Sequence, residues 1–394
     1  MTVAAYVALA VALGVSLYPY FAYPALLKLL TLGRRVPPAP QASADWPFVS
    51  IMLPAYNEAA AIAHTIERLL SLDYPAERRQ IVVVSDASTD ATDDIVTRYA
   101  ARGVELLRLP RRAGKTAAEN AARSVLKGDI IVNTDASVRI HPQAIRALVV
   151  ALRDPTVGVA SGRDLSITRL DGAANRGEGT YVGYEMWVRD LETRMSGIVG
   201  ASGCLYATRA ELHRQFVPED LSRDFAAALT ARRHGLRAVS VPGAICFVPR
   251  GGTLQQEYRR KVRTMARGLR TLWHMRALLN PARYGTFAWM LLSHKLCRWL
   301  VPWALVGSLS AVTVLAAGDG LRWAWALVAA AAGVVALALI GWHWPARRPV
   351  PRLLALPAYL VSGNLAALHA WVVALRGVGT AVWEPTRRGA EGAS

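Results

Sequence analysis

The sequence predicts an α/β domain with a parallel sheet, flanked by transmembrane helices. Two observations support this fold class. Apolar blocks stand near both ends of the chain, and residues 45–285 read as an ordinary globular sequence in which apolar strands alternate with amphipathic helices. Strands that alternate with helices are joined by right-handed crossovers, which build a parallel sheet covered by helices on both faces.

Four apolar blocks set the expected membrane segments, because a helix needs roughly 20 apolar residues to cross the hydrocarbon core. The blocks are Thr2–Leu27, Leu300–Ala317, Trp323–Trp342 and Leu353–Leu375. Tryptophans at or near the block ends, such as Trp299 and Trp344, match the aromatic belts of membrane proteins. The expected order is an N-terminal anchor (1–35), the globular domain (45–255), interfacial helices (256–298), two or three C-terminal spans (299–380) and a tail (381–394).

Basic residues beside the blocks predict the orientation. Lys28, Arg34 and Arg35 follow the first block. Cytoplasmic flanks of spans are typically basic, so we expect the globular domain in the cytoplasm at the cell (inner or plasma) membrane. The first block is too long for a cleaved signal peptide and lacks a basic start. Three C-terminal spans would leave the basic tail outside, which raises the alternative that segment 286–300 or 355–375 lies in the interface or re-enters.

The formal net charge of +18 and the three cysteines narrow the function classes. In a membrane protein the charge suits an anionic leaflet, which attracts each nearby basic residue by roughly 1 kcal/mol, so we expect no nucleic-acid partner. Cys204, Cys246 and Cys297 are odd in number and lack metal-ligand spacing. This pattern argues against a disulfide framework and against a zinc site.

The globular segment opens with four expected strands. They are residues 49–53, 81–84, 104–110 and 130–132. Pro54 is expected to end the first strand, and Asn57 to cap a helix whose apolar face runs from Ile62 to Leu70. Gly128 is expected to end the helix that follows the third strand.

Polar side chains follow three of these strands at their carboxyl ends, where open α/β sheets bind ligands. Asn57, Asp86 and Asp135 should therefore face one cleft. Mg²⁺ and Mn²⁺ bind one or two carboxylates together with substrate phosphates, so Asp135 is a candidate metal ligand; the alternative is a turn cap. No strand is followed by the glycine pattern of a dinucleotide-binding fold or of a P-loop.

Three further groups carry two interpretations each. Lys115 either supplies positive charge to phosphates or belongs to a solvated basic loop. Asp224 is either a general base or an acid at a helix N-terminus, where capping and the helix dipole favour it. The basic residues from Arg259 to Arg267 form either an interfacial amphipathic helix or a phosphate clamp.

Eight motifs in order resemble family 2 glycosyltransferases of the GT-A fold, specifically membrane-anchored ones related to cellulose, chitin, hyaluronan and poly-N-acetylglucosamine synthases. They lie between about Val49 and Leu300 and read PAYNE, VVVSDASTD, GKTAAENAA, NTDAS, GASGCLYATR, SRDF, EYRRKVR and SHKLCRW. The resemblance implies a Rossmann-like nucleotide-sugar domain, a divalent cation (Mg²⁺ or Mn²⁺) and a role in polysaccharide biosynthesis.

The resemblance also implies which residues hold the nucleotide. Tyr56, Asn57 and Glu58 match the loop that holds it. Asp86 matches the acid that contacts the base, and Lys115 matches a lysine near the nucleotide.

The remaining matches concern the reacting groups. Asp135 matches the first acid of the D-x-D motif, which ties the donor diphosphate to the metal. Ser202 and Gly203 match positions that line the donor sugar pocket, and Asp224 matches the catalytic base. The Q-x-x-R-W segment, which closes over the diphosphate and the acceptor, is matched by Arg260 and Arg263.

Three departures from the family pattern affect these expectations. Ser137 replaces the second acid of D-x-D and is a poorer cation ligand. Arg223 replaces the acid that usually precedes the base, and a cation there would lower the pKa of Asp224 unless the arginine points away. The segment around Arg263 lacks the Gln and Trp of Q-x-x-R-W, which argues against synthesis of an extended polymer.

The expected function is an inverting glycosyltransferase that moves a sugar from a nucleotide-diphosphate sugar to a lipid-linked or glycan acceptor at the membrane surface, and the expected donor is a UDP-sugar. Single transfer and short-chain synthesis remain alternatives. A different class, a catalytically silent scaffold or partner subunit, is motivated by Arg223 and Ser137.

Overall fold

A mixed sheet forms the centre of the globular domain in the computed structural model, which describes residues 2–34, 45–167, 173–249, 254–345 and 350–377. In that part of the chain the sheet has eight strands in the order β3-β2-β1-β4-β7-β6-β8-β5. Their bounds are β1 Val49–Ala55, β2 Arg79–Ser85, β3 Val104–Arg108, β4 Ile130–Thr134, β5 Arg139–Ile140, β6 Val157–Ile167, β7 Leu205–Arg209 and β8 Arg237–Pro249.

The four predicted strands are confirmed and run parallel to one another. The prediction of a parallel sheet is wrong for the other half, because β7 runs antiparallel to β4 and to β6. Pro54 does not end β1, since it pairs with Val84 inside the ladder. Asp86 and Asp135 follow the carboxyl ends of β2 and β4, as expected.

Helices cover both faces of this sheet. Their bounds are α3 Ile62–Leu70, η2 Ala76–Arg78, α4 Thr92–Thr97, η3 Ala100–Arg102, α5 Lys115–Ala122, α6 Ala144–Leu152, α8 Ala210–His213 and α9 Arg223–Arg233. The apolar faces of α3 and α6 pack with Ile51 and Leu53 on one side, while α5 packs with Met52 and Val82 on the other. The predicted end at Gly128 is wrong, because α5 stops six residues earlier.

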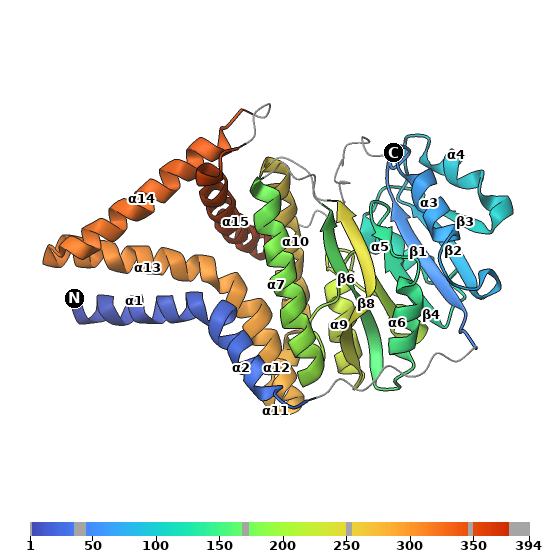
Figure 1. Cartoon of the computed structure of the whole chain (residues 1–394), viewed down its shortest axis with the longest axis horizontal. Coiled ribbons are helices and arrows are strands. Elements are labelled where there is room, and N and C mark those ends of the chain that lie inside the picture. The colour runs from blue at the N-terminus through green and yellow to red at the C-terminus, as the bar shows by residue number, and fades with distance from the viewer. Residues whose placement is uncertain (1, 35–44, 168–172, 250–253, 346–349, 378–394) are drawn as a thin grey trace.

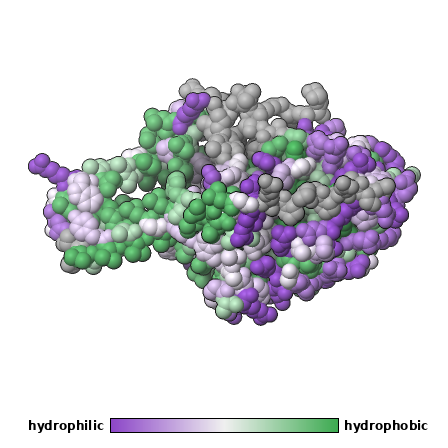
Figure 2. Space-filling view, turned by 60° about the horizontal axis from the view of Figure 1, so that its bottom comes forward, coloured by the Kyte–Doolittle hydropathy of each residue, from purple (hydrophilic) through white to green (hydrophobic). Residues whose placement is uncertain are grey.

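Long apolar helices form an arm that projects from the domain (Figure 1). The arm consists of long helices and of short helical segments continuous with them: α1 Thr2–Leu17, η1 Tyr18–Ala22, α2 Tyr23–Leu30, α12 Thr286–Leu291, η5 Leu292–Cys297, α13 Arg298–Asp319, α14 Arg322–Trp342 and α15 Arg352–Leu375. Four continuous stretches are long and apolar enough to cross a membrane: Val3–Leu30, Thr286–Asp319, Arg322–Trp342 and Arg352–Leu375. Figure 2 shows the hydrophobic surface of the arm beside the hydrophilic domain. These four candidate membrane helices indicate a membrane protein.

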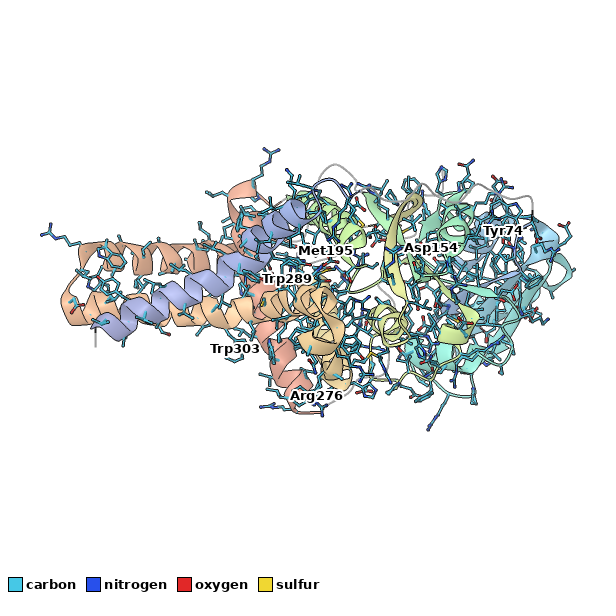
Figure 3. The ribbon with its side chains drawn as sticks, turned by 90° about the horizontal axis from the view of Figure 1, so that it is seen from below. Tyr74, Asp154, Met195, Arg276, Trp289 and Trp303 are labelled. Atoms are coloured by element: carbon cyan, nitrogen blue, oxygen red, sulfur yellow. The ribbon has the colours of Figure 1, made fainter. Side chains whose placement is uncertain are left out.

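Two amphipathic helices stand between the sheet and the arm in Figure 1: α7 Ala173–Met195 and α10 Leu254–His274. The short η4 Arg276–Leu279 and α11 Pro281–Tyr284 lead from α10 into the arm. At this junction Tyr23, Phe225 and Met290 belong to one buried apolar cluster, which joins the domain to the arm. Figure 3 shows Met195 and Trp289 here, and Trp289 donates a hydrogen bond to the Tyr18 hydroxyl at 2.9 Å. The predicted tail (381–394) lies outside the described residues.

Candidate functional site

Asp86 fixes the loop that leads into α5. Its side chain is 2% exposed, and its two oxygens accept hydrogen bonds from the backbone N–H groups of Ala113 (2.7 Å) and Gly114 (2.8 Å). Gly114 has φ +97°, a left-handed conformation that favours glycine. The carboxylate therefore holds the backbone that delivers Lys115, the first residue of α5, to the end of the sheet.

The loop after β1 is tied to the loop after β2. Asn57 has φ 52°, which rules out the helix cap expected there, and its side-chain oxygen accepts a hydrogen bond from the Thr89 N–H at 2.8 Å. The N–H of Glu58 donates to the Thr92 hydroxyl at 2.8 Å. Asparagine tolerates positive φ better than most residues, so this conformation suits the sequence.

The basic residues before α5 do not form a freely solvated loop. The Arg112 guanidinium lies over the Tyr56 ring, 3.8 Å from its centre, which is a favourable cation–π geometry. Tyr56 and Arg112 thereby connect the first predicted nucleotide-binding loop with the lysine loop.

Lys115 reaches across the end of the sheet to Asp135. Its ammonium lies 2.5 Å from Asp135 Oδ1 and 3.3 Å from the carbonyl oxygen of Gly203. Burial acts to lower the pKa of Lys115, but the carboxylates of Asp135, Glu119 and Asp224 outweigh it and raise the pKa. Lys115 is therefore a stable cation surrounded by acids.

Asp224 joins the same cluster from the first turn of α9. A Cβ atom at Gly203 would lie only 2.7 Å from Asp224 Oδ2, so this carboxylate oxygen is packed against the glycine. The hydroxyl of Ser222 donates to the other oxygen, Oδ1. Gly203 thus contacts Lys115 through its carbonyl and Asp224 through its Cα, which brings Asp135, Lys115 and Asp224 into one cluster.

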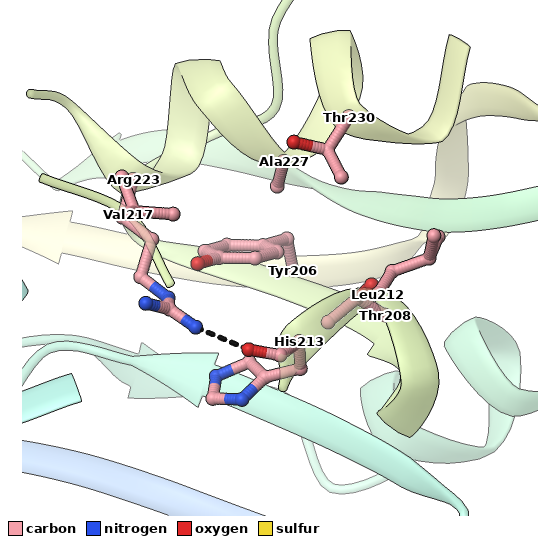
Figure 4. A pocket seen from close by; sticks show the side chains of 8 residues that line it. All are labelled: Tyr206, Thr208, Leu212, His213, Val217, Arg223, Ala227 and Thr230. Carbon is pink, nitrogen blue, oxygen red and sulfur yellow. Dashed lines mark hydrogen bonds between the residues drawn. The ribbon is translucent and has the colours of Figure 1, made fainter. Parts of the chain in front are cut away.

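Arg223 points away from Asp224 into the interior, where it lines a small cavity of about 20 Å³ (Figure 4). Its guanidinium donates to Asn120 Oδ1 at 2.7 Å and to the carbonyl oxygen of His213 at 2.5 Å. It also forms an ion pair with Glu119 at 3.8 Å. The side chain of Arg223 is therefore turned away from Asp224, which is the condition stated above for this departure from the family pattern.

Glu119 was not singled out by the sequence. It is 1% exposed on α5, and burial raises its pKa against the opposing effects of Lys115 and Arg223. The available signal in the sequence was Arg223, one residue before the candidate base. If an arginine there is buried, its charge needs an acidic partner.

Ser202 is held on the far side of Gly203. Its hydroxyl donates to both oxygens of Asp164, at 2.7 and 2.9 Å, and its N–H donates to the Ser161 hydroxyl at 2.8 Å. Asp164 lies on β6 and was not predicted, since its strand carries no motif that separates it from a structural acid. These bonds fix the 200–203 loop beside the pocket.

The helix α10 reaches the site through a residue that the sequence placed only in the basic cluster. Arg267 donates to the Thr116 hydroxyl at 2.6 Å and to the carbonyl oxygens of Glu219 (3.1 Å) and Leu221. Arg260 instead pairs with Glu257 on its own helix, at 2.6 Å. Arg263 lies one turn before Arg267, and the roles of Arg260 and Arg263 stay predictions.

The donor set can hold a divalent cation only together with a substrate. Within the described residues, no group of three His, Cys, Asp or Glu side chains is placed to bind a metal ion. Asp135 Oδ1 contacts Lys115, whereas Oδ2 accepts no hydrogen bond from the residues described, and the side chain is 28% exposed. One open carboxylate oxygen fits a cation that takes its other ligands from phosphates and water.

Comparison with known families gives two matches. The model described as "Glycosyl transferase family 2" matches residues 50–201, and the model described as "Glycosyl transferase family group 2" matches residues 130–342, more than half of the chain. Both matches include Asp135 and Gly200.

Two curated relatives share part of the chain. An N-acetylglucosaminyltransferase of Mesorhizobium japonicum is 28% identical over 256 residues, which are 58% of this chain and 59% of the relative. A beta-monoglucosyldiacylglycerol synthase of Synechocystis is 29% identical over 157 residues, which are 39% of this chain and 33% of the relative. The chain therefore matches between about a third and three fifths of the length of these relatives.

One solved structure is similar over nearly its whole length. The mannosyltransferase PcManGT from Pyrobaculum calidifontis, solved in complex with GDP-Man and Mn²⁺, has a TM-score of 0.70 and 25% sequence identity. The likeness covers 93% of this chain and 99% of that one. The GT-A architecture predicted from the sequence, together with its apolar flanking helices, is confirmed.

Proposed function

Because the chain belongs to glycosyl transferase family 2, whose members transfer sugar from a nucleotide sugar, we propose that it is an inverting enzyme acting on a lipid-linked or glycan acceptor at the membrane surface. The observation that supports this most is the cluster around Gly203. In this cluster, Asp135 and Lys115 would act on the diphosphate of the donor, and Asp224 would take the proton of an acceptor hydroxyl.

The part of the site that would bind the donor supplies positive charge for its diphosphate. The Lys115 ammonium would bind the diphosphate, and Asp86 and Tyr56 would hold the nucleotide end through the loops that they order. A Mg²⁺ or Mn²⁺ ion held by Asp135 would neutralise charge on the departing diphosphate. Ser202, fixed by Asp164, would face the donor sugar.

The acceptor end requires a base. Asp224 Oδ2 would take the proton from an acceptor hydroxyl. The hydroxyl oxygen would then bond to the anomeric carbon of the donor sugar, while the bond between this carbon and the diphosphate oxygen breaks. The Ser222 hydroxyl stabilises the carboxylate through Oδ1 and leaves Oδ2 toward the pocket. Attack opposite the leaving group inverts the anomeric configuration.

The donor is proposed to be a UDP-sugar, with a GDP-sugar as the competing choice because the similar PcManGT was solved with GDP-Man. The site is proposed to lie on the cytoplasmic face of the cell membrane, because Lys28 lies in the last turn of the first candidate span and Arg34 follows that span. Membrane helices would hold the site near lipid-linked acceptors. One of the two observations that motivated the silent-scaffold alternative no longer supports it, because Arg223 points away from Asp224.

The test is nucleotide release by the purified full chain in lipid nanodiscs with Mn²⁺, using UDP-glucose, UDP-N-acetylglucosamine and GDP-mannose in turn. Asp224→Asn should lower turnover of the accepted donor by about 10²–10⁴-fold, the typical contribution of a general base. The matched control is Asp94→Asn, at an exposed acid in the first turn of α4. Equal turnover in Asp224→Asn and wild type would disprove the base assignment.

A further inference from the structure

A charged cluster stands where the domain meets the first C-terminal span, in the SHKLCRW motif that the site above does not use. The His294 ring lies between two carboxylates of α7, with Nδ1 2.5 Å from Glu192 Oε1 and Nε2 2.8 Å from Glu185 Oε1. The Tyr23 hydroxyl donates to Glu192 at 2.6 Å, and Arg298 donates to Glu185 at 2.6 Å. Both oxygens of Glu185 and the Oε1 atom of Glu192 therefore have partners, whereas Glu192 Oε2 is buried and has no hydrogen bond among the residues described.

The backbone of this motif is a π-helix over Leu292–Cys297. Single π-helical turns inside α-helices occur frequently at functional sites, and ionisable residues within candidate spans mark functional positions. His294 is 2% exposed and held from both sides, so it fixes the rotation of the π-helical turn. The next residue, Lys295, consequently leaves the helix in a different direction.

Lys295 extends toward the catalytic loop. Its Nζ atom would lie 3.5 Å from a Cβ on Gly200, and it lies 5.5 Å from the centre of the Phe225 ring. Gly200 belongs to the loop that ends at Gly203, and Phe225 directly follows Asp224. Among the residues that the structure describes, Lys295 has no hydrogen bond or ion pair, unlike Lys115.

We propose that Lys295 binds the phosphate of the acceptor, a lipid-linked sugar whose phosphate stays at the membrane boundary while a sugar hydroxyl reaches Asp224. This proposal rests on the proposed function. Three residues from Gly200 to Gly203 span at most about 11 Å, and Phe225, which the Lys295 ammonium approaches, directly follows Asp224. The donor diphosphate has its own cation in Lys115, which leaves Lys295 for the acceptor side.

The experiment measures binding of two lipids that differ only in the phosphate. Full-length protein in detergent micelles is titrated with geranylgeranyl phosphate and with geranylgeraniol, and dissociation constants are read by microscale thermophoresis. Wild type should bind the phosphate form at least about tenfold more tightly. Lys295→Gln and Lys295→Met should reduce this preference to less than twofold, whereas Lys295→Arg should keep it. Lys127→Gln, at an exposed lysine paired with Glu105, is the matched control.

Binding of UDP and GDP with Mn²⁺ to the same variants identifies the source of the phosphate. Unchanged nucleotide affinity in Lys295→Gln supports the acceptor site and also shows that the variant is folded. Weaker nucleotide binding with an unchanged lipid preference would assign Lys295 to the donor and overturn the proposal, as would equal affinity of wild type for both lipids. Wild type that binds neither nucleotide would contradict the proposed function instead, while the lipid comparison would still test Lys295.

Discussion

At the scale of single residues, the site depends on where buried charges find partners. Arg223 and Asp224 are neighbours in the sequence, yet Asp224 faces Gly203 and Arg223 is 5% exposed among Glu119, Asn120 and the His213 carbonyl. Arg223 stands where the family resemblance predicts an acid, and α5 supplies the buried Glu119 as its ion-pair partner. The two positions act as one pair.

We expect Arg223→Met to destabilise the protein by about 3 kcal/mol, because removal of one partner leaves Glu119 buried without its ion pair. The double variant Arg223→Met with Glu119→Met should recover most of this loss, since it removes both charges and keeps the volume. The measurement is the free energy of unfolding in detergent by urea titration. Additive losses in the double variant would mean that the two residues stabilise the fold independently.

At the scale of elements, the pocket is made where three chain segments end or begin together. The end of β4 carries Asp135, the start of α5 carries Lys115, and the first turn of α9 carries Asp224. The loop that ends at Gly203 lies between them, and only a residue without a side chain fits there. The spacing of the proposed catalytic groups therefore depends on one glycine.

Gly203→Ala tests this dependence, because its methyl group would lie 2.7 Å from Asp224 Oδ2 and displace the carboxylate. We expect nucleotide release to fall by about tenfold or more, consistent with a lost contribution from a general base. Stability should change little, since Asp224 is partly exposed and can move. The control is Gly183→Ala on α7, where a methyl group meets nothing within 4 Å. Unchanged nucleotide release in Gly203→Ala would mean that the position of Asp224 does not matter for the reaction.

At the scale of the whole molecule, the arm and the domain share a core, but the last apolar helix behaves differently from the others. α15 lies beside α10 (Figure 1) and packs against both α10 and α14. Lys261 lies over the Tyr359 ring at 3.7 Å, and Arg270 donates to the Val373 carbonyl at 3.0 Å. Because α10 stands between the sheet and the arm and was predicted to be interfacial, this packing favours the interfacial alternative for segment 355–375.

An interfacial α15 would leave α13 and α14 as a hairpin and keep the C-terminal side of α15 with the domain, in agreement with the basic Arg376. Single cysteines at Gly318→Cys and Leu375→Cys, in a background without the native cysteines, test this topology. We expect a membrane-impermeant maleimide to label position 318 in intact cells and position 375 only after permeabilisation. Labelling of both positions in intact cells would show that α15 crosses the membrane.

Much of the site was predictable because strand ends in an α/β sheet converge by geometry. Asp86 and Asp135 each follow an apolar run, and parallel pairing carries both to one edge. Asn57 was misread as a cap because asparagine favours both helix starts and positive φ, and local sequence does not separate the two. Glu119 and Asp164 were missed, and Arg267 was placed only in the basic cluster, because their partners lie far away in the chain.

The sequence by itself determined the apolar helices, the parallel half of the sheet and the order of the motifs, since hydrophobic periodicity and strand-end polarity are local properties. The tertiary structure alone decided that β7 runs antiparallel, that Arg223 turns from Asp224 toward Glu119 and that Lys295 faces the catalytic loop. These outcomes depend on contacts between distant segments. A buried charge takes the orientation that gives it a partner, and only the packed chain specifies where that partner is.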